Sequence, residues 1–178
     1  LRRGRHRLGT QALFRADMTA SRSEEDKVET ASETNIREVL ARQYRAPLEM
    51  LRQAVAACPE ALWLDSSYPN RFWHIAYHAL FCTHIYLHPC YSDFRPWANH
   101  RPDYQFRGHL PWPPHERPKI DAAYGKAEVL EFHGICREEV DARVRTADLD
   151  APSGFFWLPF NKLELQLYNI RRLQHHAG

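Results

Sequence analysis

Apolar side chains recur at steps of three and four residues through much of the chain after residue 33, which predicts helices and no strands. In the first periodic segment, residues 34–58, the apolar positions are Ile36, Leu40, Tyr44, Leu48, Leu51 and Val55. Pro47 falls inside this segment and predicts a kink or a break there, and Pro59 marks its end. Two further amphipathic helices are predicted over about residues 126–144 and from about residue 160 to residue 178.

Residues 72–87, FWHIAYHALFCTHIYL, carry no proline, glycine or formal charge, and both faces of a helix formed by them are apolar. A helix that is apolar all round lies in the centre of a bundle or in a membrane. This segment is shorter than the roughly 20 apolar residues that a bilayer requires, and it carries three histidines. We therefore predict an all-α fold, a four-helix bundle with residues 72–87 as its central helix.

Residues 89–118 contain seven prolines and four Trp, Tyr or Phe residues between position 97 and position 112. So much proline excludes long regular elements, so we predict a long crossover, rich in proline and aromatic residues, between helices two and three. We expect its histidines, His100, His109 and His115, at the surface. In the last predicted helix, the apolar arc consists of Phe160, Leu163, Leu167, Ile170, Leu173 and Ala177. His175 and His176 each lie roughly 130° from the centre of this arc, on opposite sides.

The composition separates the first residues from the rest. Residues 1–17 hold five arginines and one acid, and the remaining chain has 19 Lys and Arg against 21 Asp and Glu. We expect a disordered basic and polar segment over residues 1–33, with Met18 as the biological start, and one domain over residues 34–178. The last helix has no breaker before Gly178, so we expect a truncated C-terminus.

Charge and cysteine usage limit the classes of function. Because the predicted domain is not basic, nothing indicates a nucleic-acid groove. No segment is long and apolar enough to predict a membrane span. The four cysteines form no CxxC motif, which fits reduced thiols in a cytoplasmic protein.

Histidine spacing offers the candidate chemistry. His74 and His78, and likewise His84 and His88, are pairs four residues apart that can each hold a divalent metal from one helix face. A buried histidine can equally donate to a carbonyl and fill space, and spacing alone does not choose between these roles. For His84 and His88 we favour packing. No HExxH or GxSxG motif is present.

Four features together resemble the DinB/YfiT-like family over about residues 35–178. They are the histidine-bearing WHIAYHALFCTHIYL helix, the long insertion, the third amphipathic helix and the closing run LYNIRRLQHHAG. The resemblance implies a divalent metal, usually nickel, zinc or iron, held by one histidine of the second helix and two of the last. It assigns two metal ligands, His78 and His176. The third position is Arg172, and a guanidinium has no free lone pair for a metal.

Because the third position is an arginine, the histidine triad that the resemblance implies is degraded, and several interpretations stay open. His74 or His175 can substitute as a ligand, or Arg172 can replace the charge of the metal and hold an anionic substrate group. The resemblance implies a metal-dependent enzyme acting on a small molecule, of the thiol-transferase or hydrolase type, and by analogy a homodimer. The alternative is a catalytically inactive helical bundle that binds a small molecule or a protein partner.

Overall fold

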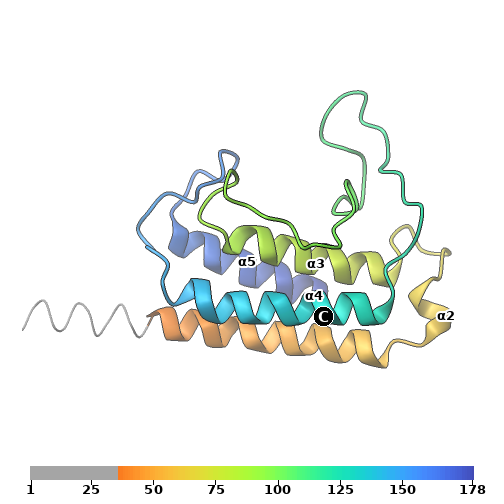
Figure 1. The fold of residues 1–178 in the computed structure, drawn as a ribbon, viewed down its shortest axis with the longest axis horizontal. Helices are drawn as coiled ribbons and strands as arrows, with labels where there is room; N and C mark the ends of the chain where they lie inside the picture. Colours follow the sequence, from red (N-terminus) through yellow and green to blue (C-terminus); the bar gives the residue numbers. More distant parts are fainter. Residues whose placement is uncertain (1–35) are drawn as a thin grey trace, which may run out of the picture. The chain divides into compact units, whose positions relative to one another are not determined.

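The computed structural model describes residues 36–178, so the predicted segment 1–33 lies outside the described residues. The chain divides into two compact units after Glu38, and the second, Val39–Gly178, contains the fold. Within the described range the fold is all-α, as predicted (Figure 1). The only strand-like pairing there is an isolated bridge between Pro152 and Asn161.

The N-terminal helix, which covers residues 36–57 of the described chain, runs through Pro47 without interruption (Figure 1). The predicted break at this residue is therefore wrong. Pro47 is itself buried, and Tyr44 and Leu48 on either side of it are almost completely excluded from solvent. The burial of these flanking side chains offsets the missing hydrogen bond of the proline. The helix ends before Pro59, as predicted.

The short helix α2 (Glu60–Trp63) follows, and the periodicity did not predict it. It buries Trp63, whose indole Nε1 donates a hydrogen bond to the carbonyl of Tyr124 over 2.9 Å. The next helix, α3 (Phe72–Leu87), has the bounds that its uncharged run predicts. Thirteen of its 16 residues are buried, so it occupies the centre of the packed helices.

Three later elements pack around α3. Helix α4 (Lys126–Glu139) continues directly into a π-helical turn, η1 (Val140–Val144), where the sequence predicts a single helix. Helix α5 (Lys162–Ala177) lies against α3, and so do α4 and η1 (Figure 1). The N-terminal helix reaches α5 through Tyr44, whose hydroxyl donates to Gln166 Oε1 over 2.8 Å.

The buried face of α5 differs from the predicted arc. Leu167 is 55% exposed, although the arc includes it. The buried residues of this helix are Lys162, Leu165, Gln166, Asn169 and Leu173. The buried face is therefore rotated by roughly a quarter turn toward His176. Gln166 and Asn169 find tertiary partners there: Tyr44 donates to Gln166 Oε1, and Asn169 Nδ2 donates to the carbonyl of Thr83 over 3.1 Å, which lowers the cost of burying these two groups.

Residues 88–125 connect α3 and α4 without a helix of their own. Trp97 and Tyr104 are buried, and Trp97 stacks on Phe132 of α4 at a centroid distance of 4.8 Å. His109 and His115 are exposed, as predicted. His100 is only partly exposed, and its Nδ1 shares a 2.5 Å hydrogen bond with the hydroxyl of Tyr77.

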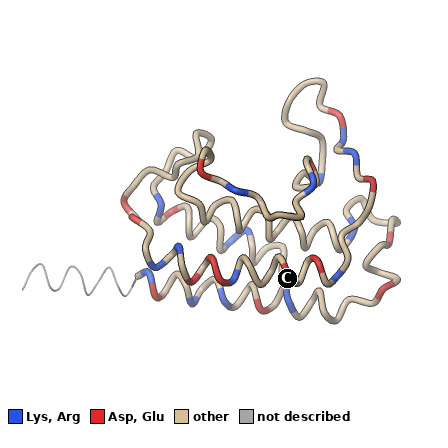
Figure 2. The backbone as a smooth tube through the Cα atoms, viewed as in Figure 1, with Lys and Arg blue, Asp and Glu red and all other residues tan. Residues whose placement is uncertain are grey.

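Charges are spread along the described chain. Figure 2 shows Lys and Arg interspersed with Asp and Glu along the tube, while α3 itself has no charged residue. Among the described residues, no helix combines the length and the apolar character that crossing a bilayer demands.

His133 of α4 joins the N-terminal helix, because its Nε2 donates to the carbonyl of Leu48 over 2.9 Å. Its pKa is lowered chiefly by burial; the Leu48 carbonyl and Glu49 act in the opposite direction, and Arg52 and Arg137 lower it further. The folded protein therefore binds a proton at His133 less readily than the unfolded chain does. Stability from this residue is complete above the unfolded pKa of about 6.5 and is lost as the pH falls below it.

We expect the substitution His133→Gln, which keeps a side-chain N–H donor, to flatten the fall in the free energy of unfolding below pH 6.5. The slopes of the unfolding free energy against pH differ between parent and variant by at most one bound proton, which is about 1.4 kcal/mol per pH unit. Urea unfolding between pH 7.5 and pH 5 measures it, with the exposed His109→Gln as control. Equal slopes of the unfolding free energy against pH in the parent and in His133→Gln would contradict this account.

Candidate functional site

Helix α3 positions two separate groups of histidines. His74 is satisfied within the fold: its Nε2 lies 2.7 Å from the carbonyl of Tyr104, and its ring stacks on Trp73. The bond to Tyr104 occupies one ring nitrogen of His74, and no contact joins its ring to His78 or His176 in the described structure. His78 faces α5, and His84 and His88 face α4 and η1.

The structure brings the two histidines assigned by resemblance together. The ring centroids of His78 and His176 lie 5.1 Å apart, edge to face. Arg172 lies beside them, with Nη2 at 3.2 Å from His78 Nε2 and at 3.2 Å from the sulfur of Cys82. We call His78, Cys82, Arg172 and His176 the His78 cluster. His175 is exposed.

Hydrogen bonds fix the tautomer of His78. Its Nδ1 lies 2.6 Å from the carbonyl of Gln105, an acceptor only, so Nδ1 carries the proton. Nε2 then has the lone pair, and the guanidinium of Arg172 donates to it. The nitrogen that would bind a metal is therefore occupied by an N–H group of Arg172.

The His78 cluster is rich in positive charge. Burial lowers the pKa of His78 to about 3, and Arg107, Arg172 and His176 lower it further against the opposing effect of the Gln105 carbonyl. Burial and the same two arginines, together with His175, lower the pKa of His176 to about 4. Both imidazoles are thus neutral at pH 7, and two guanidinium groups carry the charge of the site.

A second group forms between α3 and α4. His84 and His88 are both 3% exposed, and His84 Nε2 lies 3.2 Å from Glu139 Oε2. One ligand atom from each of the three residues can be chosen so that all lie within 4.8 Å of one another, so these residues could hold a metal ion. We call His84, His88 and Glu139 the His84 cluster. Among the described residues it is the only group of three or more His, Cys, Asp or Glu that meets this criterion.

Arg143 of η1 contacts the His84 cluster. Its Nη2 lies 3.3 Å from His88 Nε2 and 3.2 Å from Glu139 Oε1. Burial by itself raises the pKa of Glu139, but its contacts with His84 and Arg143 outweigh burial and lower that pKa to about 2. The carboxylate is therefore ionised at neutral pH.

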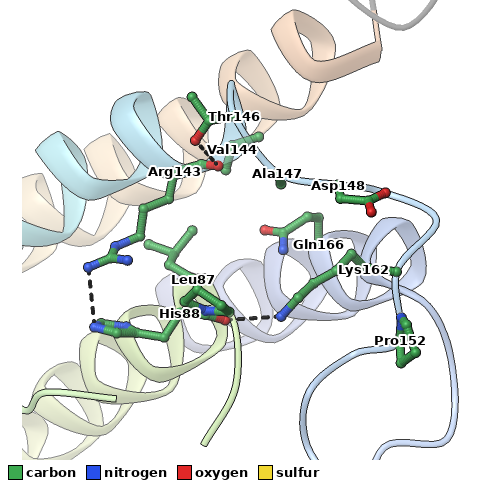
Figure 3. A pocket seen from close by; sticks show the side chains of 12 residues that line it. Leu87, His88, Arg143, Val144, Thr146, Ala147, Asp148, Pro152, Lys162 and Gln166 are labelled. Atoms are coloured by element: carbon green, nitrogen blue, oxygen red, sulfur yellow. Dashed lines mark hydrogen bonds between the residues drawn. The ribbon is translucent and has the colours of Figure 1, made fainter. Parts of the chain in front are cut away.

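A cavity of about 280 Å³ adjoins this cluster, with His88 and Arg143 in its wall. Figure 3 shows the Arg143 guanidinium directed at the His88 ring and the Lys162 ammonium directed at the His88 carbonyl, 3.0 Å away. Burial lowers the pKa of Lys162 to about 8. The ammonium donates to two backbone carbonyls, those of His88 and Ser153, and so ties α5 to the end of α3.

Sequence reasoning missed several of these residues. Arg107 and Gln105 lie in the irregular segment 88–125, where no periodicity indicates which side chains point inward. The sequence does indicate Glu139 as a candidate, because it lies three residues after Cys136 and seven after Phe132, on the buried stripe of its helix. A carboxylate on an apolar stripe requires a partner, which here is His84.

Comparisons of the chain with protein-family models, with curated proteins and with solved structures found no match. The DinB/YfiT-like resemblance therefore stays a prediction.

The cysteines provide a test of the electrostatics at the His78 cluster. Burial raises the pKa of Cys82, although Arg172 and Arg107 act to lower it. Cys58 and Cys136 are also buried, with pKa values raised mainly by burial, and only Cys90 is partly exposed.

We expect iodoacetamide at pH 8 to alkylate Cys90 at least tenfold faster than Cys82, because a thiol reacts as its accessible thiolate. Peptide mass spectrometry of the native protein measures both rates, and the Cys90→Ser variant is the control for residual labelling. Comparable rates at the two positions would mean that the arginines hold Cys82 as an accessible thiolate.

Proposed function

We propose that this protein is a DinB/YfiT-like four-helix bundle that binds a small anionic molecule at the His78 cluster, in place of the metal that the resemblance implies. The order of the helices supports this assignment, as does the long segment 88–125 between α3 and α4. The proximity of His78 to His176 supports the position of the site. The proposed activity is binding, and no catalytic step is assigned.

The observation that carries the proposal is the position of Arg172. Its Nη2 donates to His78 Nε2 and to Cys82 Sγ, and its Nη1 donates to the hydroxyl of Tyr168 over 2.9 Å. A divalent ion at His78 would have to displace this N–H group and would then lie beside a permanent cation. Both effects oppose metal binding at this position.

The arginines also supply the attraction for an anion. Within residues 36–178, no carboxylate forms an ion pair with Arg107 or Arg172. The Nε atoms of both arginines are buried and have no hydrogen-bond partner in that range. Buried N–H donors without partners are costly, and a guanidinium binds a carboxylate or a phosphate through two parallel hydrogen bonds. A small ligand with such a group would neutralise the charge and fill these donors.

The substitution Arg172→Gln tests this proposal. It removes the charge and keeps a polar side chain, so we expect about a tenfold or greater loss of affinity for inorganic phosphate or citrate. Isothermal titration calorimetry at constant ionic strength measures the affinity and separates binding from salt screening. The matched control is Arg171→Gln, at an exposed position next along the helix.

Two results would overturn the proposal. One is an unchanged affinity for both anions in Arg172→Gln, which would place the binding elsewhere. The other is the absence of any saturable binding of phosphate or citrate by the parent protein. Circular dichroism of each variant checks that it is folded.

The substitution Arg172→His tests whether position 172 can supply the third metal ligand that the resemblance implies. It adds a third imidazole beside His78 and His176, and we expect the protein to gain one equivalent of bound Zn²⁺. The experiment uses a His84→Gln background, so that the His84 cluster does not contribute, and elemental analysis after dialysis gives the stoichiometry. Arg171→His in the same background is the control. No gain of metal would mean that position 172 is not aligned with the two histidines as a ligand.

A further inference from the structure

The His84 cluster has the features of a metal site independent of the His78 cluster. Its ligands come from the ends of two helices: His84 lies in the last turn of α3, His88 directly follows α3, and Glu139 is the last residue of α4. His84 lies six residues after His78, about 9 Å along a helix axis, and two residues after Cys82 of the His78 cluster. The two clusters contact different helices, because Cys82 contacts Arg172 of α5 and His84 contacts Glu139 of α4. No residue is shared between the two clusters.

A hydrogen bond fixes the tautomer of His88. Its Nδ1 lies 3.0 Å from the carbonyl of His84, so Nδ1 carries the proton and Nε2 keeps the lone pair. A metal-binding histidine commonly donates its other ring N–H to a carbonyl, which fixes the tautomer and the ring orientation.

Two buried atoms of the cluster have no hydrogen bond in the described structure. They are Glu139 Oε2 and His84 Nδ1. The other carboxylate oxygen, Oε1, accepts from Arg143, so the side chain is held while Oε2 faces His84 Nε2 at 3.2 Å. His84 Nε2 contacts this ionised oxygen without a well-aligned hydrogen bond, so a cation between Oε2 and the imidazoles would compensate its charge more fully.

We propose that His84, His88 and Glu139 bind one divalent transition-metal ion of the zinc class, through His84 Nε2, His88 Nε2 and a Glu139 carboxylate oxygen. Two imidazoles and one carboxylate favour zinc and related ions over Mg²⁺ and Ca²⁺, which take oxygen ligands. Three protein ligands leave at least one coordination position open for water or a small ligand.

Arg143 has a positioning role in this site. Its Nη2 lies 3.3 Å from His88 Nε2 and 3.2 Å from Glu139 Oε1. Metal binding requires Arg143 to release His88 Nε2, just as a metal at His78 would have to displace Arg172, but here the ionised Glu139 supplies a negative charge that the His78 cluster lacks. The bond of Arg143 to Glu139 can stay and orient the carboxylate. The adjoining cavity, lined by His88 and Arg143, provides space for the guanidinium to move and for a ligand to approach (Figure 3).

Zn²⁺ titration of tag-free protein, followed by calorimetry and by thermal unfolding, tests this site. We expect one equivalent to bind and to raise the melting temperature, because a ligand that binds only the folded state stabilises it. Glu139→Gln and His88→Gln should each weaken the affinity at least tenfold and abolish the thermal shift. The matched controls, Glu138→Gln and His109→Gln at exposed positions, should change neither.

Specific outcomes would overturn the proposal. No stoichiometric binding of Zn²⁺, or of Co²⁺ as a second probe, would do so. Binding that survives Glu139→Gln and His88→Gln but is lost in His175→Gln would assign the metal to the exposed adjacent histidines instead. Should His88→Gln not fold, Glu139→Gln decides, because this substitution is isosteric and the Glu139 side chain is 23% exposed. Because these variants leave Arg172 intact, their result is separate from the test of anion binding.

Discussion

The burial of α3 is the constraint on which the rest of the structure depends. A helix without formal charge lies at the centre of the packed helices, so every imidazole that it carries must find its partner inside the protein. The backbone of segment 88–125 supplies two of these partners, the carbonyls of Tyr104 and Gln105 for His74 and His78. Helix α4 supplies Glu139 for His84. The long irregular segment is therefore part of the core of the site and does more than connect two helices.

The two histidine clusters on α3 differ in the charge that surrounds them. Around His78 the fold places Arg172 and Arg107 without a carboxylate from the described residues, which favours an anion. Around His84 it places an ionised Glu139, whose contact with Arg143 leaves one oxygen directed at the imidazole, which favours a cation. Helix α3 thus places histidine side chains in two environments, one that favours an anion and one that favours a cation. The residues around each imidazole decide what it can bind.

Helix α5 illustrates how polar side chains displace a hydrophobic pattern. Gln166 and Asn169 are buried, with Gln166 Oε1 accepting from Tyr44 and Asn169 Nδ2 donating to the carbonyl of Thr83, while Leu167 is exposed. The resulting rotation turns Arg172 and His176 toward α3, where the apolar arc alone would leave His176 at the rim. The geometry of the His78 cluster therefore follows from two hydrogen bonds between distant parts of the chain.

The sequence by itself determined the helical class, the bounds of α3 and the apolar stripe of α4, because these depend on local periodicity and on runs without charge, proline or glycine. The resemblance pointed to His78, Arg172 and His176, and the structure brings these three side chains together. The tertiary structure decided the continuity of the first helix through Pro47, the face that α5 buries and the partners Arg107 and Glu139. These features depend on contacts between residues far apart in the chain, whose energies no local pattern records.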